Sequence, residues 1–125
     1  MNETLLIVDD DASLSDLYRL ELEDEGYRVL TAHSGPEALR ALEGQHADLV
    51  VLDIRMEGMD GLDTLAEILK VRREMPVILN SAYSNFKTDF GAWNADAYVV
   101  KSANLEELKS RIRDVLLRRA KARAA

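Results

Sequence analysis

The chain has 125 residues, of which 47% are hydrophobic and 31% charged, a composition typical of one soluble globular domain with a sizeable core. Its 16 basic and 23 acidic residues give a net charge of -7, which disfavours direct binding to nucleic acid. The absence of cysteine excludes disulfides and thiol chemistry, and no apolar run approaches the roughly 18 residues that a membrane helix needs. We therefore expect a cytoplasmic protein that binds no membrane.

The first part of the chain alternates short apolar runs with segments of helical spacing. Thr4 to Asp9 is an apolar, β-branched run that stops at three consecutive aspartates, which predicts a first buried strand. Leucines recur close to helical spacing over 12–25, and Gly26 stands where a left-handed helix end is expected. Residues 27–32 predict a second strand, and 34–44 a short second helix that begins with serine and proline.

The middle of the chain contains the most informative run. At 48–53, four apolar residues lie between two aspartates, which predicts a strand buried on both faces and ending at Asp53. A third helix is expected over 61–73, and a fourth strand over 76–81, where the proline is tolerated at the first position. An acid at the end of a buried run must be solvated, paired or functional.

The last part of the chain has a weak point at 84–94. This segment is poor in helix formers and contains a glycine, so it predicts a short, irregular or mobile fourth helix. A fifth strand is expected over 96–100, and a capping box at 104–107 opens a last helix that runs to about Arg119. The basic stretch 119–125 either extends this helix or begins a linker.

Strands that alternate with helices through short connections predict right-handed crossovers and a single α/β domain over 1–125. The expected architecture is a doubly wound, five-stranded parallel sheet with helices on both faces. If the strand order is 2-1-3-4-5, the ends of the first and third strands flank the point where open sheets bind ligands.

Carboxylates gather at that point. Asp9 and Asp10 follow the first strand and would lie close to Asp53. Three such groups repel one another unless some are protonated or a cation lies among them, and hard oxygen ligands suit Mg²⁺. Ser81 and Lys101 end the fourth and fifth strands and would reach the same edge, which together describes a site for a phosphoryl group. The alternative is that acids such as these cap helices and face solvent.

Four stretches carry these residues: Leu-Ile-Val-Asp-Asp-Asp at 6–11, Asp-Leu-Val-Val-Leu-Asp with Met-Asp-Gly-Leu at 48–62, Pro-Val-Ile-Leu-Asn-Ser at 76–81, and Tyr-Val-Val-Lys at 98–101. Together they resemble the receiver domain of two-component response regulators, over Leu5 to about Leu117. The resemblance implies the flavodoxin-like fold with the strand order 2-1-3-4-5, for which a member of this family is a standard example.

The resemblance also implies how the phosphoryl group is handled. Asp53 matches the phosphoacceptor, which takes the group from the phosphohistidine of a histidine kinase. Ser81 matches the hydroxyl that hydrogen-bonds the group, and Lys101 the lysine that pairs with it. Ser81 and Tyr98 would form the switch, coupled to a surface made by the segment 84–94, the fifth strand and the last helix.

The implied cofactor is Mg²⁺. By the same resemblance, Asp10 and Asp53 would be direct ligands, and Asp9 would act mainly through water. Arg55 falls where the family donates a backbone carbonyl to the metal, so this role does not constrain its side chain.

Three departures from the family pattern stand out. Glu57 replaces a common proline, so the loop after Asp53 is expected to be less rigid. Residue 102 is serine where the family has a cis proline, and because a cis bond before a non-proline residue costs about 2.5 to 4 kcal/mol, we expect a trans bond. Arg55 and Tyr83 are bulky at positions that overlook the site, which suggests that they hinder water and lengthen the phosphoryl lifetime.

The leading functional interpretation is a phosphorylation switch rather than a turnover enzyme. Its partners would be a sensor histidine kinase or phosphotransfer protein, and a downstream protein or an output domain. Leu117 lies off the apolar stripe of the last helix, which suggests a partner contact or a weak homodimer. Two alternatives are a pseudo-receiver that binds partners constitutively, and a Mg²⁺-dependent phosphohydrolase; the second lacks the cap and the acid-base residue that such an enzyme needs.

Overall fold

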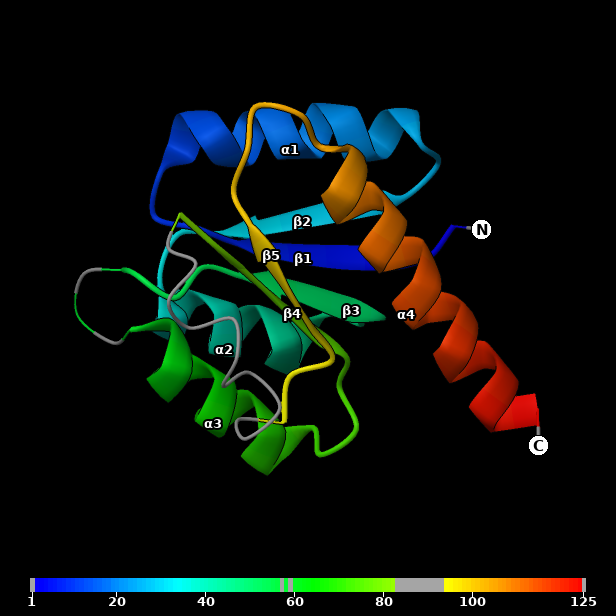
Figure 1. Ribbon diagram of the computed structural model, residues 1–125. Helices are drawn as coiled ribbons and strands as arrows, with labels where there is room; N and C mark the ends of the chain where they lie inside the picture. The colour runs from blue at the N-terminus through cyan, green and yellow to red at the C-terminus, as the bar shows by residue number, and fades with distance from the viewer. Residues whose placement is uncertain (1, 57, 59, 83–93, 125) are drawn as a thin grey trace.

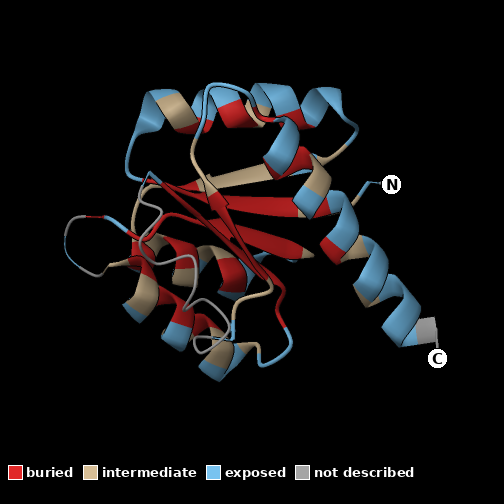
Figure 2. Ribbon diagram, in the orientation of Figure 1, coloured by how far each residue is buried: buried red, intermediate tan, exposed pale blue. Residues whose placement is uncertain are grey.

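The sheet is parallel and five-stranded, with the order β2-β1-β3-β4-β5, which confirms the predicted fold. It is seen in a computed structural model that describes residues 2–56, 58, 60–82 and 94–124 (Figure 1). The strands are β1 (Thr4–Val8), β2 (Arg28–Ala32), β3 (Leu49–Leu52), β4 (Val77–Ser81) and β5 (Ala97–Val100). Every residue of β3 and β4 is buried, whereas the edge strand β2 is partly exposed (Figure 2).

Helices cover both faces of the sheet. The described helices are α1 (Ala12–Asp24), α2 (Gly35–Gly44), α3 (Gly61–Val71) and α4 (Glu106–Ala124). Helices α1 and α4 lie on one face, and α2 and α3 on the other (Figure 1). Because side chains alternate along a strand, each strand contributes to two separate apolar clusters, one per face.

The helix ends follow local sequence signals. Asp11, Ser34 and Asp60 each accept a hydrogen bond from the backbone amide three residues later, as N-cap residues do. Gly26 has a φ of 100°, and the Tyr27 amide donates to the Leu22 carbonyl at 3.2 Å, so α1 ends in the predicted left-handed turn. These caps determine where each helix starts and how the preceding loop meets it.

The last helix is longer than predicted. It continues past Arg119 to Ala124, because its final residues are mostly alanine and basic residues, which are good helix formers and suit the negative end of the helix dipole. The predicted tail is therefore helical as far as Ala124. The expectations for residues 84–94, including Tyr83 beside them, concern a segment of which only Asn94 is described.

Two further features match expectation. No cis peptide bond occurs among the described residues, so the bond between Lys101 and Ser102 is trans. No helix in the described part of the chain is long and apolar enough to cross a membrane.

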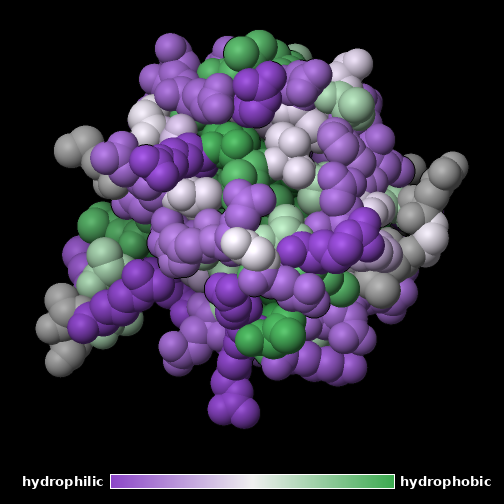
Figure 3. Space-filling model, turned by 180° about the vertical axis from the view of Figure 1, so that it is seen from behind, coloured by the Kyte–Doolittle hydropathy of each residue, from purple (hydrophilic) through white to green (hydrophobic). Residues whose placement is uncertain are grey.

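Seen from behind, the surface is mostly hydrophilic and its apolar atoms form separate groups (Figure 3). The large apolar side chains exposed in the described residues are Leu17, Leu20, Val71 and Leu117.

Candidate functional site

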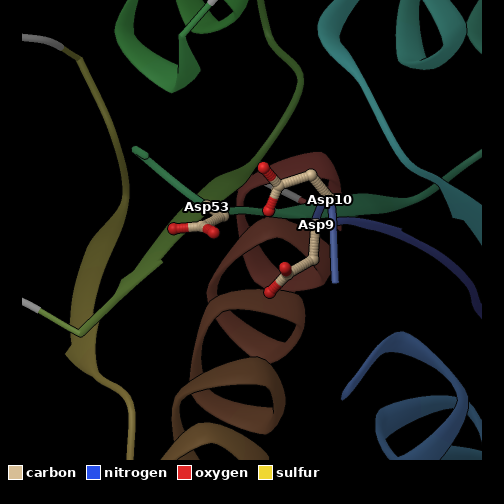
Figure 4. A group of neighbouring side chains, drawn as sticks. All are labelled: Asp9, Asp10 and Asp53. Carbon is tan, nitrogen blue, oxygen red and sulfur yellow. The ribbon is translucent and has the colours of Figure 1, made fainter. Parts of the chain in front are cut away.

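The site is built at the carboxyl ends of β1 and β3. Val8 pairs with Leu52 at the ends of the two strands. The residues that follow them, Asp9 and Asp53, therefore lie side by side. Asp10 follows at once, and ligand oxygens of the three aspartates lie within 4.8 Å of one another. Figure 4 shows these carboxylates around one point. The predicted convergence of the three acids is therefore observed.

Lys101 closes this group from the end of β5. Its Nζ donates to Asp9 Oδ2 at 2.8 Å and to Asp53 Oδ2 at 3.1 Å. The side chains of Asp9 and Asp53 are only 3% and 7% exposed, and that of Lys101 is 18% exposed. Truncating Lys101 would leave two buried carboxylates without their positive partner, whereas truncating either acid would leave Lys101 paired with the other.

The carboxylates are also held by backbone amides of the following loops. The Asp11 amide donates to Asp9 Oδ1 at 3.0 Å, and the Arg55 amide donates to Asp53 Oδ1 at 3.3 Å. Each buried carboxylate therefore accepts a hydrogen bond from a backbone amide at one oxygen and from Lys101 at the other. The Asp10 side chain, in contrast, is exposed. The Arg55 side chain also lies on the exposed side of its loop.

Burial and neighbouring charges oppose each other in the site, and burial prevails at Asp53 but not at Lys101. Burial raises the pKa of Asp53, and Asp9 raises it further, against the opposing effects of Lys101 and of the Arg55 amide. For Lys101, burial lowers the pKa, but the contacts with Asp9 and Asp53 outweigh it and raise the pKa overall. Lys101 is therefore a fixed positive charge at neutral pH.

The donor set fits Mg²⁺. Three carboxylates and one ammonium leave an excess of negative charge that a divalent cation would balance, and all the side-chain donors are hard oxygens. The exposure of Asp10 leaves that side open to water, which Mg²⁺ normally retains. Asp10 is the exposed member of the three acids, whereas Asp9 and Asp53 are buried and both contact Lys101.

Ser81 and Tyr98 lie on the adjoining strands. Ser81 is the last residue of β4 and fully buried, and its carbonyl accepts the Lys101 amide at 2.6 Å. Tyr98 pairs with Leu79 and is 2% exposed, so it lies on the same face as Ser81, two residues away along the neighbouring strand. Tyr83, predicted to overlook the site, lies outside the described residues.

Gly61 is a functional residue to which the sequence analysis gave no role. A Cβ at this position would overlap the Asp53 carbonyl and lie 2.5 Å from the Ile54 Cα. Its amide donates to the Ile54 carbonyl at 2.7 Å, so the start of α3 is packed directly on the end of β3. The signal was present in the sequence, since a glycine immediately after the N-cap Asp60 is a poor helix former that needs a packing reason.

Comparison with known proteins decides the family. The sequence model of the response regulator receiver domain matches residues 5–113. The chain is a response regulator receiver domain. The transcriptional regulatory protein GlrR of Escherichia coli (strain K12) is 41% identical over 114 residues, which cover 90% of this chain and 26% of GlrR. The receiver thus spans about a quarter of this relative.

Solved receivers share the same fold. The response regulator TrrA of Thermotoga maritima, in complex with Mg²⁺ and BeF, is 42% identical with a TM-score of 0.85, over 90% of this chain and 98% of TrrA. TrrA bound to the histidine kinase ThkA has a TM-score of 0.84 at 42% identity, over 91% of this chain and 98% of TrrA. The receiver therefore belongs to a family of signalling switches in two-component systems.

Proposed function

We propose that this receiver accepts a phosphoryl group on Asp53 from the phosphohistidine of a sensor histidine kinase or phosphotransfer protein, with Mg²⁺ as cofactor. The observation that carries the proposal is the buried contact of Lys101 with both Asp9 and Asp53, beside the exposed Asp10. The TrrA complexes, with Mg²⁺ and BeF and with a histidine kinase, are consistent with this chemistry.

In the proposed transfer, an Asp53 carboxylate oxygen attacks phosphorus in line with the donor histidine. The phosphorus–nitrogen bond breaks, and the imidazole leaves with the bonding electron pair. Mg²⁺ would offset negative charge on the phosphoryl oxygens. Lys101 pairs with one of these oxygens and the Ser81 hydroxyl donates to another, so catalysis consists mainly of positioning and electrostatics.

The product would act as a switch because of its charge. A phosphoryl group adds about -1.5 to -2 charges at pH 7. The charged group would attract the side chains of Ser81 and Lys101, whose backbones are joined by the 2.6 Å hydrogen bond. Tyr98, on the neighbouring strand, would then change its position. The altered surface would be that of β5, α4 and the segment between β4 and β5, which would bind a downstream protein or an output domain.

Intact mass spectrometry tests the assignment. Incubation with Mg²⁺ and acetyl phosphate should add one phosphoryl group to the wild type, and Asp53→Asn should abolish the adduct because amide nitrogen and oxygen are poor nucleophiles. Asp16→Asn, on an exposed turn of α1, is the matched control and should be labelled like the wild type. A wild type without adduct would support a constitutive pseudo-receiver instead, and rapid turnover of varied phosphoesters would support a hydrolase.

Arg55 and Tyr83 would set the lifetime of the adduct. Arg55 is two residues beyond Asp53 and its side chain is exposed, which supports a role in restricting the approach of water. Arg55→Ala and Tyr83→Ala should each speed dephosphorylation severalfold, measured as loss of the adduct mass after the donor is removed. Arg28→Ala, at the opposite end of the sheet, should have no effect. Unchanged rates in both site variants would disprove this gating.

A further inference from the structure

A polar pair lies inside the apolar cluster beneath the site. Val51, Ile78 and Val99 face the α1 and α4 side of the sheet. By alternation, the residues two positions later, Asp53, Asn80 and Lys101, face the same side. Leu52 pairs with Leu79, so one further step of the register places Asn80 beside Asp53, while Asn80 pairs with Val99 on its other side.

Asn80 is joined there to helix α1. Its Nδ2 donates to the Tyr18 hydroxyl at 3.1 Å, and the two residues are 3% and 2% exposed. The pKa of Tyr18 is raised, chiefly by burial, and the charges of Lys101, Asp9 and Asp53 all act on it, so the phenol lies within electrostatic range of the site. We call Tyr18 and Asn80 the polar floor.

Stability alone does not require the polar floor. Apolar side chains of similar shape at both positions would be neutral or stabilising in this cluster, whereas either polar group alone would be left unsatisfied. The hydrogen bond instead holds the end of β4 at a defined place, since it connects Asn80 to a helix that begins three residues after Asp9.

This link completes a ring around the carboxylates. The carbonyl of Ser81, next to Asn80, accepts the Lys101 amide at 2.6 Å, and Lys101 Nζ returns to Asp9 at 2.8 Å. Helix α1 connects Asp9 back to Tyr18. Loss of the hydrogen bond between Tyr18 and Asn80 would therefore let Ser81 and Lys101 shift together, while both of their side chains remain present.

We propose that Tyr18 and Asn80 are positioning residues for phosphoryl transfer, which act by holding Ser81 and Lys101 at the rim through the end of β4. This inference rests on the proposed function of Asp53. It assigns the pair a kinetic role, in contrast to a pair that only fills the core.

The test uses Tyr18→Phe, which removes one oxygen atom, Asn80→Leu, and the double variant, which restores an apolar pair. Phosphorylation by acetyl phosphate is followed by intact mass over a series of Mg²⁺ concentrations, and folding by chemical denaturation. Tyr27→Phe is the matched control, since Tyr27 is a partly buried tyrosine whose pKa is also raised by burial, but it lies beyond the C-terminal end of α1.

We expect the double variant to be as stable as the wild type but phosphorylated about three- to tenfold more slowly at saturating Mg²⁺, the range of one hydrogen bond. The Mg²⁺ concentration at half-maximal rate should stay within about twofold, because the aspartates are intact; Tyr27→Phe should match the wild type. A folded Tyr18→Phe and a folded double variant that both react at the wild-type rate would overturn the inference while leaving the proposed function in place. A wild type that takes no phosphoryl group would overturn both.

Discussion

Asp53 is buried, yet in the proposed phosphoryl transfer it would have to react as a charged carboxylate. These two properties conflict in one residue, because burial disfavours the charged form. Burial raises its pKa above the ordinary value of 3.8, so its carboxyl binds a proton more tightly in the folded than in the unfolded chain. The free energy of unfolding therefore falls as the pH rises from the unfolded pKa through the folded one.

Asp53→Asn should consequently stabilise the metal-free receiver. Its melting temperature should exceed that of the wild type by a few degrees at pH 7, because the buried charge is removed and Lys101 keeps Asp9 as a partner at 2.8 Å. The difference should vanish at a pH below the unfolded pKa, where the wild-type carboxyl is neutral in both states. Calorimetry across pH measures this, and an equal difference at acid pH would refute the electrostatic cause.

At this scale, the sequence predicted the charged residues but not the groups that support them. The charged and polar residues of the site could be assigned to the ends of strands because each ends a recognisable apolar run. They are Asp9, Asp10, Asp53, Ser81 and Lys101. The close approach at Gly61, in contrast, depends on how α3 packs on β3. The Tyr18–Asn80 contact depends on the register of two strands and on the rotation of α1, which no local pattern contains.

Among the elements, α4 is fixed to the sheet by Asp96. This carboxylate precedes β5, accepts the Val77 amide at 3.0 Å, and contacts Arg119 of α4 at 3.1 Å. It thus joins the starts of β4 and β5 to the second half of the last helix. Since β5 and α4 form part of the proposed output surface, Asp96 adds to the apolar contacts that orient this surface.

Substitutions at Asp96 should separate the two contacts. Asp96→Ala should lower the free energy of unfolding by about 1 to 3 kcal/mol, because the Val77 amide loses its acceptor. Asp96→Asn keeps an acceptor and loses only the partly exposed ion pair, so its cost should stay below about 1 kcal/mol, as should that of Arg119→Gln. Urea denaturation provides the values. Equal costs for the alanine and asparagine variants would show that the ion pair, not the amide contact, dominates.

Elements were predictable to the extent that their signals were local. The caps at Asp11, Ser34 and Asp60, and the glycine end of α1, lie where helices begin or end in the structure. The sequence leaves the end of α4 open between Arg119 and an extension over 119–125, because no glycine or proline marks it and only helix propensity remains as a guide. The sequence of 84–94 carries two conflicting signals. Its residues have low helix propensity, but the regular alternation of strands and helices calls for a helix there.

For the whole molecule, the alternation of strands and helices was sufficient to predict the class and the parallel sheet. Alternation alone does not give the strand order 2-1-3-4-5, because several orders are compatible with right-handed crossovers; the order came from the family resemblance. Charge is also unevenly distributed: basic residues concentrate in α4, while acids of the site, of the second half of α1 and of the loops give the domain its net charge of -7. In the proposed function a phosphoryl group would approach an acidic edge, where a cation and Lys101 would offset the repulsion.

The packing at Gly61 also bears on how the loop after Asp53 can vary. The amide of Gly61 donates to the carbonyl of Ile54, so the two ends of the intervening loop are joined to each other next to the end of β3. We therefore expect that the residues between these ends can be replaced by those of another receiver without displacing Asp53, provided that position 61 stays glycine.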